Sequence, residues 1–446
     1  MTVKLSDHFT YKKIFKATIS PILMMVFTSL YCIVDGIFVS NFAGLNAFAG
    51  INMIFPVTMI IGGLGFMIGS GGAALVSKTI GEGLKERANK LFSMIIYFTL
   101  IFATLVSIAG YFMIEPLAYY LASFGETTQE MIDNAIIYGQ ILMLGELTFM
   151  LQNMFQSFFM VAEKPTMGFV FTIFAGIANM VLDYLLIGIL GWGVVGAAIA
   201  TITSQAVGGV LPLFYFIFKK DLLIRLVPAK IELKPIIRTC TNGVSEFIGN
   251  ISSALIGLVF NVQLLRYIGE QGLSAYGIIM YVQFIFIAIF IGYTIGVSPI
   301  VGYNFGSKNH EELKNVLKKS LIIILSTGVM MFIIAESLSR PLCLIFASSD
   351  EELIKITEQG IKIFSFSFIY CGIGLFTSAF FTALNNGLVS GLISTLRMFV
   401  YQILCIILLP LMFDTIGIWL SVVVSEFLSL ITSFVFLIVN KKKYQY

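Results

Sequence analysis

Two aspartates stand inside long apolar segments of this sequence, where ionisable side chains are rare. Asp35 lies in YCIVDGIFVS and Asp183 in IANMVLDYLLIG, and Asn179 precedes Asp183 by one helical turn. A carboxylate in a bilayer interior costs at least about 2.5 kcal/mol, so such a residue usually has a function. Carboxylate and amide oxygens on one helical face can hold a proton or a small cation. These residues predict a membrane-embedded site for a positive charge.

Other embedded polar residues extend this candidate site. Thr201, in GAAIATITSQ, would add a hydroxyl oxygen if its helix packs beside that of Asp183. Taken singly, Asn179 and Thr201 are better explained by hydrogen bonds between helices, whereas two acids in one half of the chain favour a binding site. Further embedded acids are Glu146, Glu246 and Glu426.

Composition places these residues in a membrane protein. The chain of 446 residues is 58% hydrophobic and 11% charged, and it has 42 Phe, which is outside the usage of soluble domains. Apolar stretches of about 20 residues predict an all-α integral membrane protein with twelve spans. The spans lie near residues 16–40, 51–77, 91–114, 134–161, 167–190, 193–218, 239–265, 274–303, 319–346, 361–384, 388–412 and 416–440.

The basic residues predict the orientation of these spans. Of 27 Lys and Arg, 22 fall in the termini and in the loops after the second, fourth, sixth and eighth spans. Positive-inside reasoning therefore puts both termini in the cytoplasm of a multi-pass cell-membrane protein. The polar start of the chain shows no signal-peptide pattern. The net charge of +3 follows from this topology and does not indicate nucleic acid as a partner. Cysteine and histidine spacings suggest no metal site.

The two halves of the sequence resemble each other. GFMIGSGGAALVSK from Gly65 and GYTIGVSPIVGYNF from Gly292 are similar segments displaced by half the chain. Duplicated halves are typical of carriers, whose substrate site lies between two similar helix bundles. We expect two pseudo-symmetric six-helix lobes, 1–218 and 239–446, joined by a cytoplasmic linker, 219–238. The positions of the second half that correspond to Asp35, Asn179 and Asp183 carry no acid, which favours a functional role for these residues.

The chain resembles the multidrug and toxic compound extrusion (MATE) transporters. The matching pieces are PILMMVFTSLYCIVDGIFVSNFAG, NMVLD with the following GWGVVGAAIAT, and GVSPIVGYNFGSKN, in this order. The resemblance implies a two-lobed antiporter that exports amphipathic, often cationic compounds in exchange for H+ or Na+. It also implies a cation site at the matching positions Asp35, Asn179, Asp183 and Thr201. Glu246 is similar to a seventh-helix acid of other members, but the tenth-helix acid of some sodium-coupled members is absent from FSFSFIYCGIGLF.

We expect the bound cation and a cationic drug to compete for this site. Substrate contacts are expected at Asp35, Asp183 and Glu246, with Phe149 and Met150 lining an adaptable apolar chamber. With 42 Phe and 20 Met in the chain, packing is the commoner explanation for any one of them. A proton is favoured over Na+, because an acid pair shares a proton with less ligand geometry than Na+ needs. We expect no cofactor, no metal other than Na+, a monomer, and amphipathic small molecules and the lipid bilayer as partners.

Two alternatives remain open at this point. A lipid-linked saccharide flippase of related fold would need a basic cavity for phosphate, and Arg397 is the one well-embedded base. An intramembrane aspartyl enzyme would use two aspartates that share a proton. The paired YD and GxGD signatures of such enzymes are absent from the sequence.

The topology is testable by labelling introduced cysteines with a membrane-impermeant thiol reagent. Because acidic loops should face outward, a cysteine at Glu130 should react from outside the cell, and one at Lys85 or Lys230 should not. The reverse pattern would overturn both the topology and the direction of export.

Overall fold

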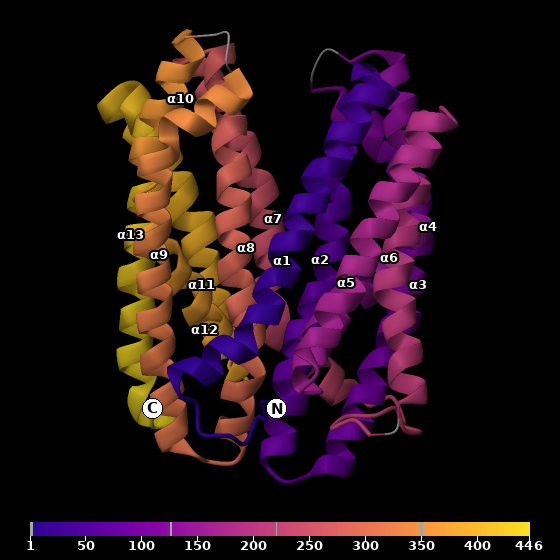
Figure 1. Ribbon diagram of the computed structural model, residues 1–446, viewed down its shortest axis with the longest axis vertical. Helices are drawn as coiled ribbons and strands as arrows, with labels where there is room; N and C mark the ends of the chain where they lie inside the picture. The colour runs from indigo at the N-terminus through magenta and orange to yellow at the C-terminus, as the bar shows by residue number, and fades with distance from the viewer. Residues whose placement is uncertain (1–2, 125–126, 220, 348–350) are drawn as a thin grey trace.

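The computed structural model describes residues 3–124, 127–219, 221–347 and 351–446, and within these ranges the chain is helical without a β-strand. The helices form two groups that lie side by side (Figure 1). Their bounds are α1 Tyr11–Phe38, η1 Val39–Ala43, α2 Leu45–Gly81, α3 Lys85–Ala122, α4 Gln129–Val161, α5 Pro165–Asp183, η2 Tyr184–Ile189, α6 Gly193–Phe218, α7 Leu233–Tyr267, α8 Glu270–Gly306, α9 His310–Ala347, α10 Glu351–Phe364, α11 Ser367–Ala383, α12 Gly387–Ser394, η3 Thr395–Tyr401 and α13 Gln402–Tyr444, where η marks a π-helical segment.

The described helices make twelve membrane crossings. Nine segments are each long and apolar enough for one crossing, and α10 with α11 forms another that is bent by 49°. The last segment, Gly387–Tyr444, has 58 residues, or about 87 Å of helix, nearly three times the roughly 30 Å of a hydrocarbon core. Asp414 interrupts it with φ 51° and ψ −135°, and a 2.7 Å hydrogen bond joins Tyr401 to Thr432 across the reversal. This segment therefore crosses twice, and the predicted fold class is confirmed.

The tenth span, predicted near 361–384, is formed by two helices with a bend between them. The charged helix α10 ends at Phe364, and the chain bends before α11 begins at Ser367. The reason is that α10 carries acidic and basic side chains such as Glu358 and Lys362, which favour the water-facing boundary over hydrocarbon. In Figure 1, α10 lies across one end of its lobe.

The duplication is visible in the backbone as well as in the sequence. Left-handed φ values recur at Gly44 and Gly269, at Gly83 and Lys308, and at Glu163 and Asn385, which lie 225, 225 and 222 residues apart. Equivalent turns therefore end equivalent helices in the two pseudo-symmetric lobes, α1–α6 (the N-lobe) and α7–α13 (the C-lobe). The predicted domain boundaries at 218 and 239 stay a prediction.

The segment between the lobes is not a free linker. It runs along α3, where Asn89 Oδ1 accepts a hydrogen bond from the Arg225 N–H at 3.1 Å and Ser93 Oγ accepts one from the Val227 N–H at 2.8 Å. Ile224 is fully buried there. Helix α7 then begins at Leu233, inside the predicted linker. The N-lobe thus holds the segment that enters the C-lobe.

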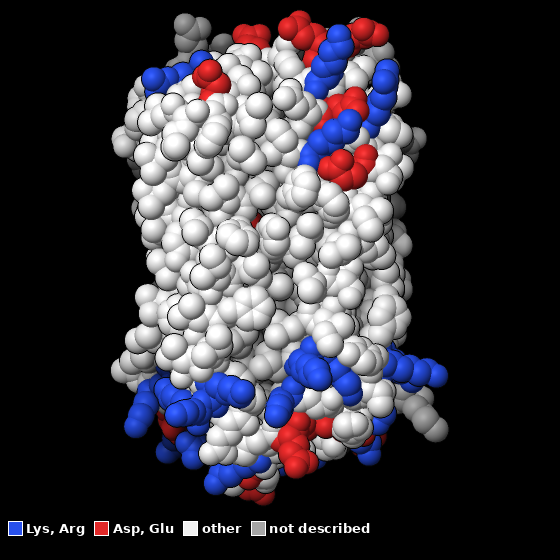
Figure 2. All heavy atoms as spheres, turned by 90° about the vertical axis from the view of Figure 1, so that its left-hand side faces the viewer, with Lys and Arg blue, Asp and Glu red and all other residues white. Residues whose placement is uncertain are grey.

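Both termini lie at one end of the molecule, which we call the basic end (Figure 1). Lys and Arg gather there, and a broad belt with almost no charge separates this end from the opposite one on the face shown in Figure 2. Many large apolar side chains, such as Phe112 and Ile438, are exposed. This pattern suits a chain surrounded by lipid at mid-height and by water at both ends.

The lobes pack closely at the basic end and lie apart at the other. A Cβ atom on Gly71 of α2 would collide with backbone of α7, and one on Gly243 of α7 would collide with backbone of α2. Toward the opposite end, Gly36 of α1, Gly257 of α7 and Gly277 of α8 have no other atom within 4 Å of such a position. Small residues thus permit the close backbone approach that holds this conformation.

The first described residues strap the two lobes together at the basic end. Within residues 3–10, which we call the N-terminal strap, the Leu5 N–H donates to Glu163 Oε1 of the N-lobe at 2.7 Å. The Phe9 N–H donates to Glu312 Oε1 of the C-lobe at 2.9 Å. Burial raises the pKa of Glu163, and the hydrogen bond from Leu5 acts in the opposite direction.

The close contact between α2 and α7, which we call the seam between the lobes, allows a test with two matched substitutions. Gly243→Leu should prevent closure of the basic end and remove most transport, because its side chain would meet α2 backbone. Gly257→Leu on the same helix should leave the basic end closed, because no neighbouring atom lies within 4 Å of its Cβ position in this conformation. Thiol labelling of a cysteine placed at Lys78 measures closure directly. Equal labelling in the two variants would show that the Gly243 contact does not hold the conformation.

Candidate cation site

Asp35 and Asp183 meet inside the N-lobe. Helices α1 and α5 pack against each other and bring the two carboxyl groups close enough to interact electrostatically. Asp183 is fully buried, and Asp35 is half-buried. One Asp35 oxygen and both Asp183 oxygens are shielded from solvent without a hydrogen-bond donor among the described residues. No ion pair in the described part of the chain includes either acid, so the cluster lacks a counter-charge.

Both acids lie next to irregular helical turns. Helix α1 passes into η1 one turn after Asp35, and α5 ends at Asp183, where η2 begins. The segments η1 and η2 contact each other. A π-helical turn is uncommon and frequently occurs at functional sites. The backbone is therefore distorted where the two carboxyl groups converge.

The remaining predicted cation ligands surround this pair. Asn179 is 2% exposed, and its side-chain oxygen has no donor among the described residues. Thr201, on the neighbouring α6, donates its hydroxyl to the Ala197 carbonyl at 3.0 Å. Tyr138 of α4 lies close to both acids and to Thr201. The structure thus gathers oxygen atoms from α1, α4, α5 and α6, and their role as ligands stays a prediction.

Sequence reasoning missed three members of this neighbourhood. Tyr138 gives no signal in a chain with 18 tyrosines, because only the packing of α4 brings it to the acids. Tyr31, one turn before Asp35, lies near Gln152 of α4. Gln152 is 4% exposed and retains an oxygen without a donor among the described residues. The sequence did contain a signal for Gln152, because an amide inside a predicted membrane span, here in the segment LQNMFQS, often has a function.

The other predicted substrate residues lie outside the acid cluster. Glu246 is half-buried on α7, one helical turn from both Gly243 and Asn250, and these two residues face α2. It therefore lies on the seam between the lobes. Phe149 is half-buried and packs near Gly62 of α2, whereas Met150 is fully buried in the N-lobe core. Met150 is not accessible to a substrate in this conformation.

The C-lobe contains a charge cluster that is balanced. Arg397 of η3 donates to both carboxylate oxygens of Glu426 at 2.9 and 2.8 Å, and the side chains are 6% and 7% exposed. A bidentate pair of this kind satisfies the guanidinium and the carboxylate together. Arg397 is therefore engaged and does not form the basic phosphate cavity that a saccharide flippase would need.

Known proteins resemble this chain in sequence and in fold. The family model MatE matches residues 21–185 and 247–408. The chain belongs to the MatE family. The Multidrug export protein MepA of Staphylococcus saprophyticus subsp. saprophyticus is 26% identical, with 85% of this chain and 84% of that protein covered. The crystal structure of MATE in complex with MaL6 superposes with a TM-score of 0.93 at 20% identity, covering 100% of this chain and 99% of that one.

A second solved structure describes one conformation of such a protein. The outward-facing conformation of a multidrug resistance MATE family transporter superposes on the MatE chain with a TM-score of 0.92 at 21% identity, covering 100% and 98% of the two chains. These structural likenesses show the fold. The family and the relatives are transporters, so the resemblance seen in the sequence is confirmed and the intramembrane enzyme is excluded.

The ion pair of the C-lobe yields a stability prediction. Arg397→Leu should destabilise the protein by about 3–5 kcal/mol, because it leaves the Glu426 carboxylate buried without a partner. The double variant Arg397→Leu/Glu426→Leu should recover most of that loss, since both charges are removed. Thermal unfolding of the purified protein measures both effects. A double variant no more stable than the single one would show that the pair has a role beyond charge balance.

Proposed function

We propose that this MatE protein exports amphipathic, cationic small molecules in exchange for a cation that binds between Asp35 and Asp183. The relatives named as multidrug export proteins support export of drug-like small molecules. The acid pair supports the exchange, because it is a negatively charged cluster that offers no positive side chain of its own among the described residues.

The adjacency of the two carboxyl groups carries the proposal. Two carboxylates that share one site repel each other, so ionisation of both at once is disfavoured. The pair therefore gains free energy when one positive charge joins it. A proton or Na+ and a cationic drug would compete for this charge, and such competition couples the two fluxes in opposite directions.

The conformation suggests where each step of the cycle takes place. With the basic end in the cytoplasm, the lobes would lie apart on the outer side. Asp35 is half-buried and therefore partly accessible, whereas Asp183 behind it is fully buried. In this state, the external cation would reach Asp35 and displace the drug outward. The cation-bound lobes would then rock to open the basic end.

The proton is the coupling ion we propose. A carboxyl pair needs no further ligand to share one proton. Na+ requires several oxygens in a fixed geometry, and here Asn179 and Thr201 would have to complete its shell. Glu246, on the seam, would contact the drug during passage between the lobes.

Transport by purified protein in liposomes tests this proposal. A pH gradient alone should drive drug movement, and a sodium gradient at symmetric pH should not. Asp35→Asn and Asp183→Asn should each reduce coupled transport by about tenfold or more, because a neutral amide no longer binds a proton. Lower pH on the drug-release side should accelerate release, since protonation removes the charge that holds the cation.

A matched control separates this role from a general effect of neutralising aspartate. Asp414→Asn makes the same chemical change at an exposed turn between two spans and should leave transport near wild type. Sodium-driven transport without proton movement would overturn proton coupling and make Asn179 and Thr201 ligands. Full transport by the Asp35→Asn/Asp183→Asn protein would overturn the site itself.

A further inference from the structure

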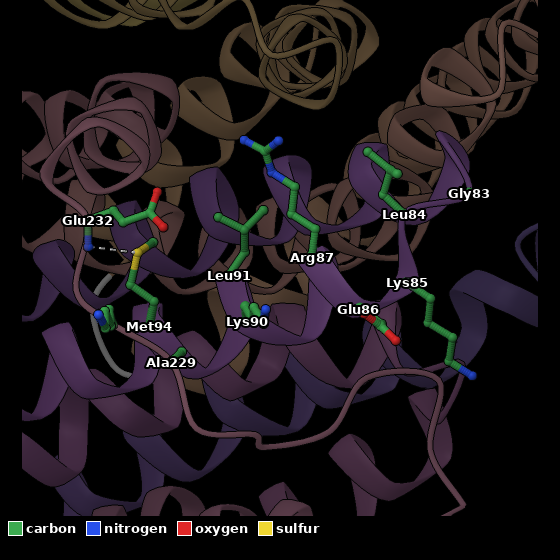
Figure 3. A pocket seen from close by; sticks show the side chains of 11 residues that line it. Gly83, Leu84, Lys85, Glu86, Arg87, Lys90, Leu91, Met94, Ala229 and Glu232 are labelled. Atoms are coloured by element: carbon green, nitrogen blue, oxygen red, sulfur yellow. Dashed lines mark hydrogen bonds between the residues drawn. The ribbon is translucent and has the colours of Figure 1, made fainter.

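A second site lies at the basic end, away from the acid pair. A pocket of about 720 Å³ opens between the α2–α3 turn, the first turns of α3 and the segment that joins the lobes (Figure 3). The segment passes alongside α3, and the Glu232 N–H donates to the Met94 sulfur at 3.4 Å. The pocket is lined by Gly83, Leu84, Lys85, Glu86, Arg87, Lys90, Leu91, Met94, Ala229, Lys230 and Glu232.

The pocket is positively charged. Lys85, Arg87 and Lys90 come from the start of α3, and Lys230 comes from the joining segment, against two glutamates. Each of the four basic side chains is exposed. None of them takes part in an ion pair within the ranges that the structure describes. Four unpaired cations around one concavity would attract an anion, and a phosphate group suits both Arg and Lys.

Apolar side chains continue from the rim of this pocket. Leu84 on the lining is 47% exposed, and Ile231, Leu233 and Ile237 along the joining segment and the start of α7 are 51%, 71% and 52% exposed. Such residues are stable in this position if they face lipid. This region therefore combines a basic pocket with an apolar strip. A molecule with a negatively charged group and a hydrocarbon part would fit both.

The walls of the pocket are held in place. Asn89 and Ser93 of α3 bind the backbone of the joining segment at Arg225 and Val227, only a few residues before Lys230. An anion in the pocket would therefore contact the N-lobe through Arg87 and Lys90 and, through Lys230, the segment that leads into α7 of the C-lobe.

We propose that this pocket binds the headgroup of an anionic phospholipid from the leaflet at the basic end. The phosphate would lie among Arg87, Lys90 and Lys230, and the acyl chains would run along Leu233 and Ile237. Juxtamembrane basic clusters attract anionic lipids, and the apolar strip favours a lipid over a soluble anion. The lipid would fasten the joining segment to the N-lobe.

Thermal unfolding of the full-length protein in detergent tests the site. Phosphatidylglycerol should raise the unfolding midpoint by at least about 3 °C more than phosphatidylcholine does. The variant Arg87→Gln/Lys90→Gln/Lys230→Gln should lose this difference. The control Lys441→Gln/Lys442→Gln/Lys443→Gln removes the same charge from the basic end outside the pocket and should keep it. Inorganic phosphate at equal concentration should give no comparable shift.

Any other result of these measurements would overturn the proposal. A difference that persists in the pocket variant, or that disappears equally in the control, would show non-specific attraction to the basic end. An equal shift with inorganic phosphate would show a site for soluble anions. If the triple variant fails to fold, Lys230→Gln alone changes only an exposed side chain of the joining segment. Native mass spectrometry should then show weaker retention of phosphatidylglycerol by Lys230→Gln than by wild type, and equal retention would overturn the site.

Discussion

Lipid offers no hydrogen-bond partner to a peptide group, and this absence shapes the whole molecule. The backbone satisfies its polar groups within helices, and apolar side chains gain little by leaving lipid for one another. Helices therefore associate where small residues let backbones touch. Gly71 and Gly243 provide such a contact between the lobes. Each helix keeps its own backbone hydrogen bonds, and the close contacts lie at the basic end. The two lobes can therefore separate at the other end without exposing unpaired backbone groups.

Two clusters of charged side chains inside the lipid-surrounded lobes differ in their charge balance. Arg397 and Glu426 cancel each other in the C-lobe and need nothing more. Asp35 and Asp183 in the N-lobe do not cancel, and a positive charge from outside the chain would complete them. A duplicated scaffold thus carries a closed electrostatic cluster in one half and an open one in the other. In the proposed mechanism, the open cluster provides the coupling.

Hydropathy and charge predicted the spans and the embedded acids, because lipid acts on each segment of sequence separately. The internal repeat predicted the two lobes. Contacts between residues that lie far apart in the sequence could not be predicted from hydropathy and charge. Arg397 and Glu426 were both visible as embedded charges, but only the reversal at Asp414 brings them together. Tyr138 reached the acid site through helix packing alone. Met150 looked available for substrate because a Met in an apolar span has the same sequence signature whether it faces a chamber or a core.

The N-terminal strap has a consequence for the synthesis of the protein. Phe9 emerges from the ribosome early, whereas its partner Glu312 follows about 300 residues later. At 5–20 residues per second, this interval is roughly 15 to 60 s. During that time the strap has no C-lobe to bind, so the nascent N-lobe must remain in the membrane without it. The hydrogen bond between Phe9 and Glu312 therefore forms only after α9 has been made, and it marks a chain whose second lobe has joined the first.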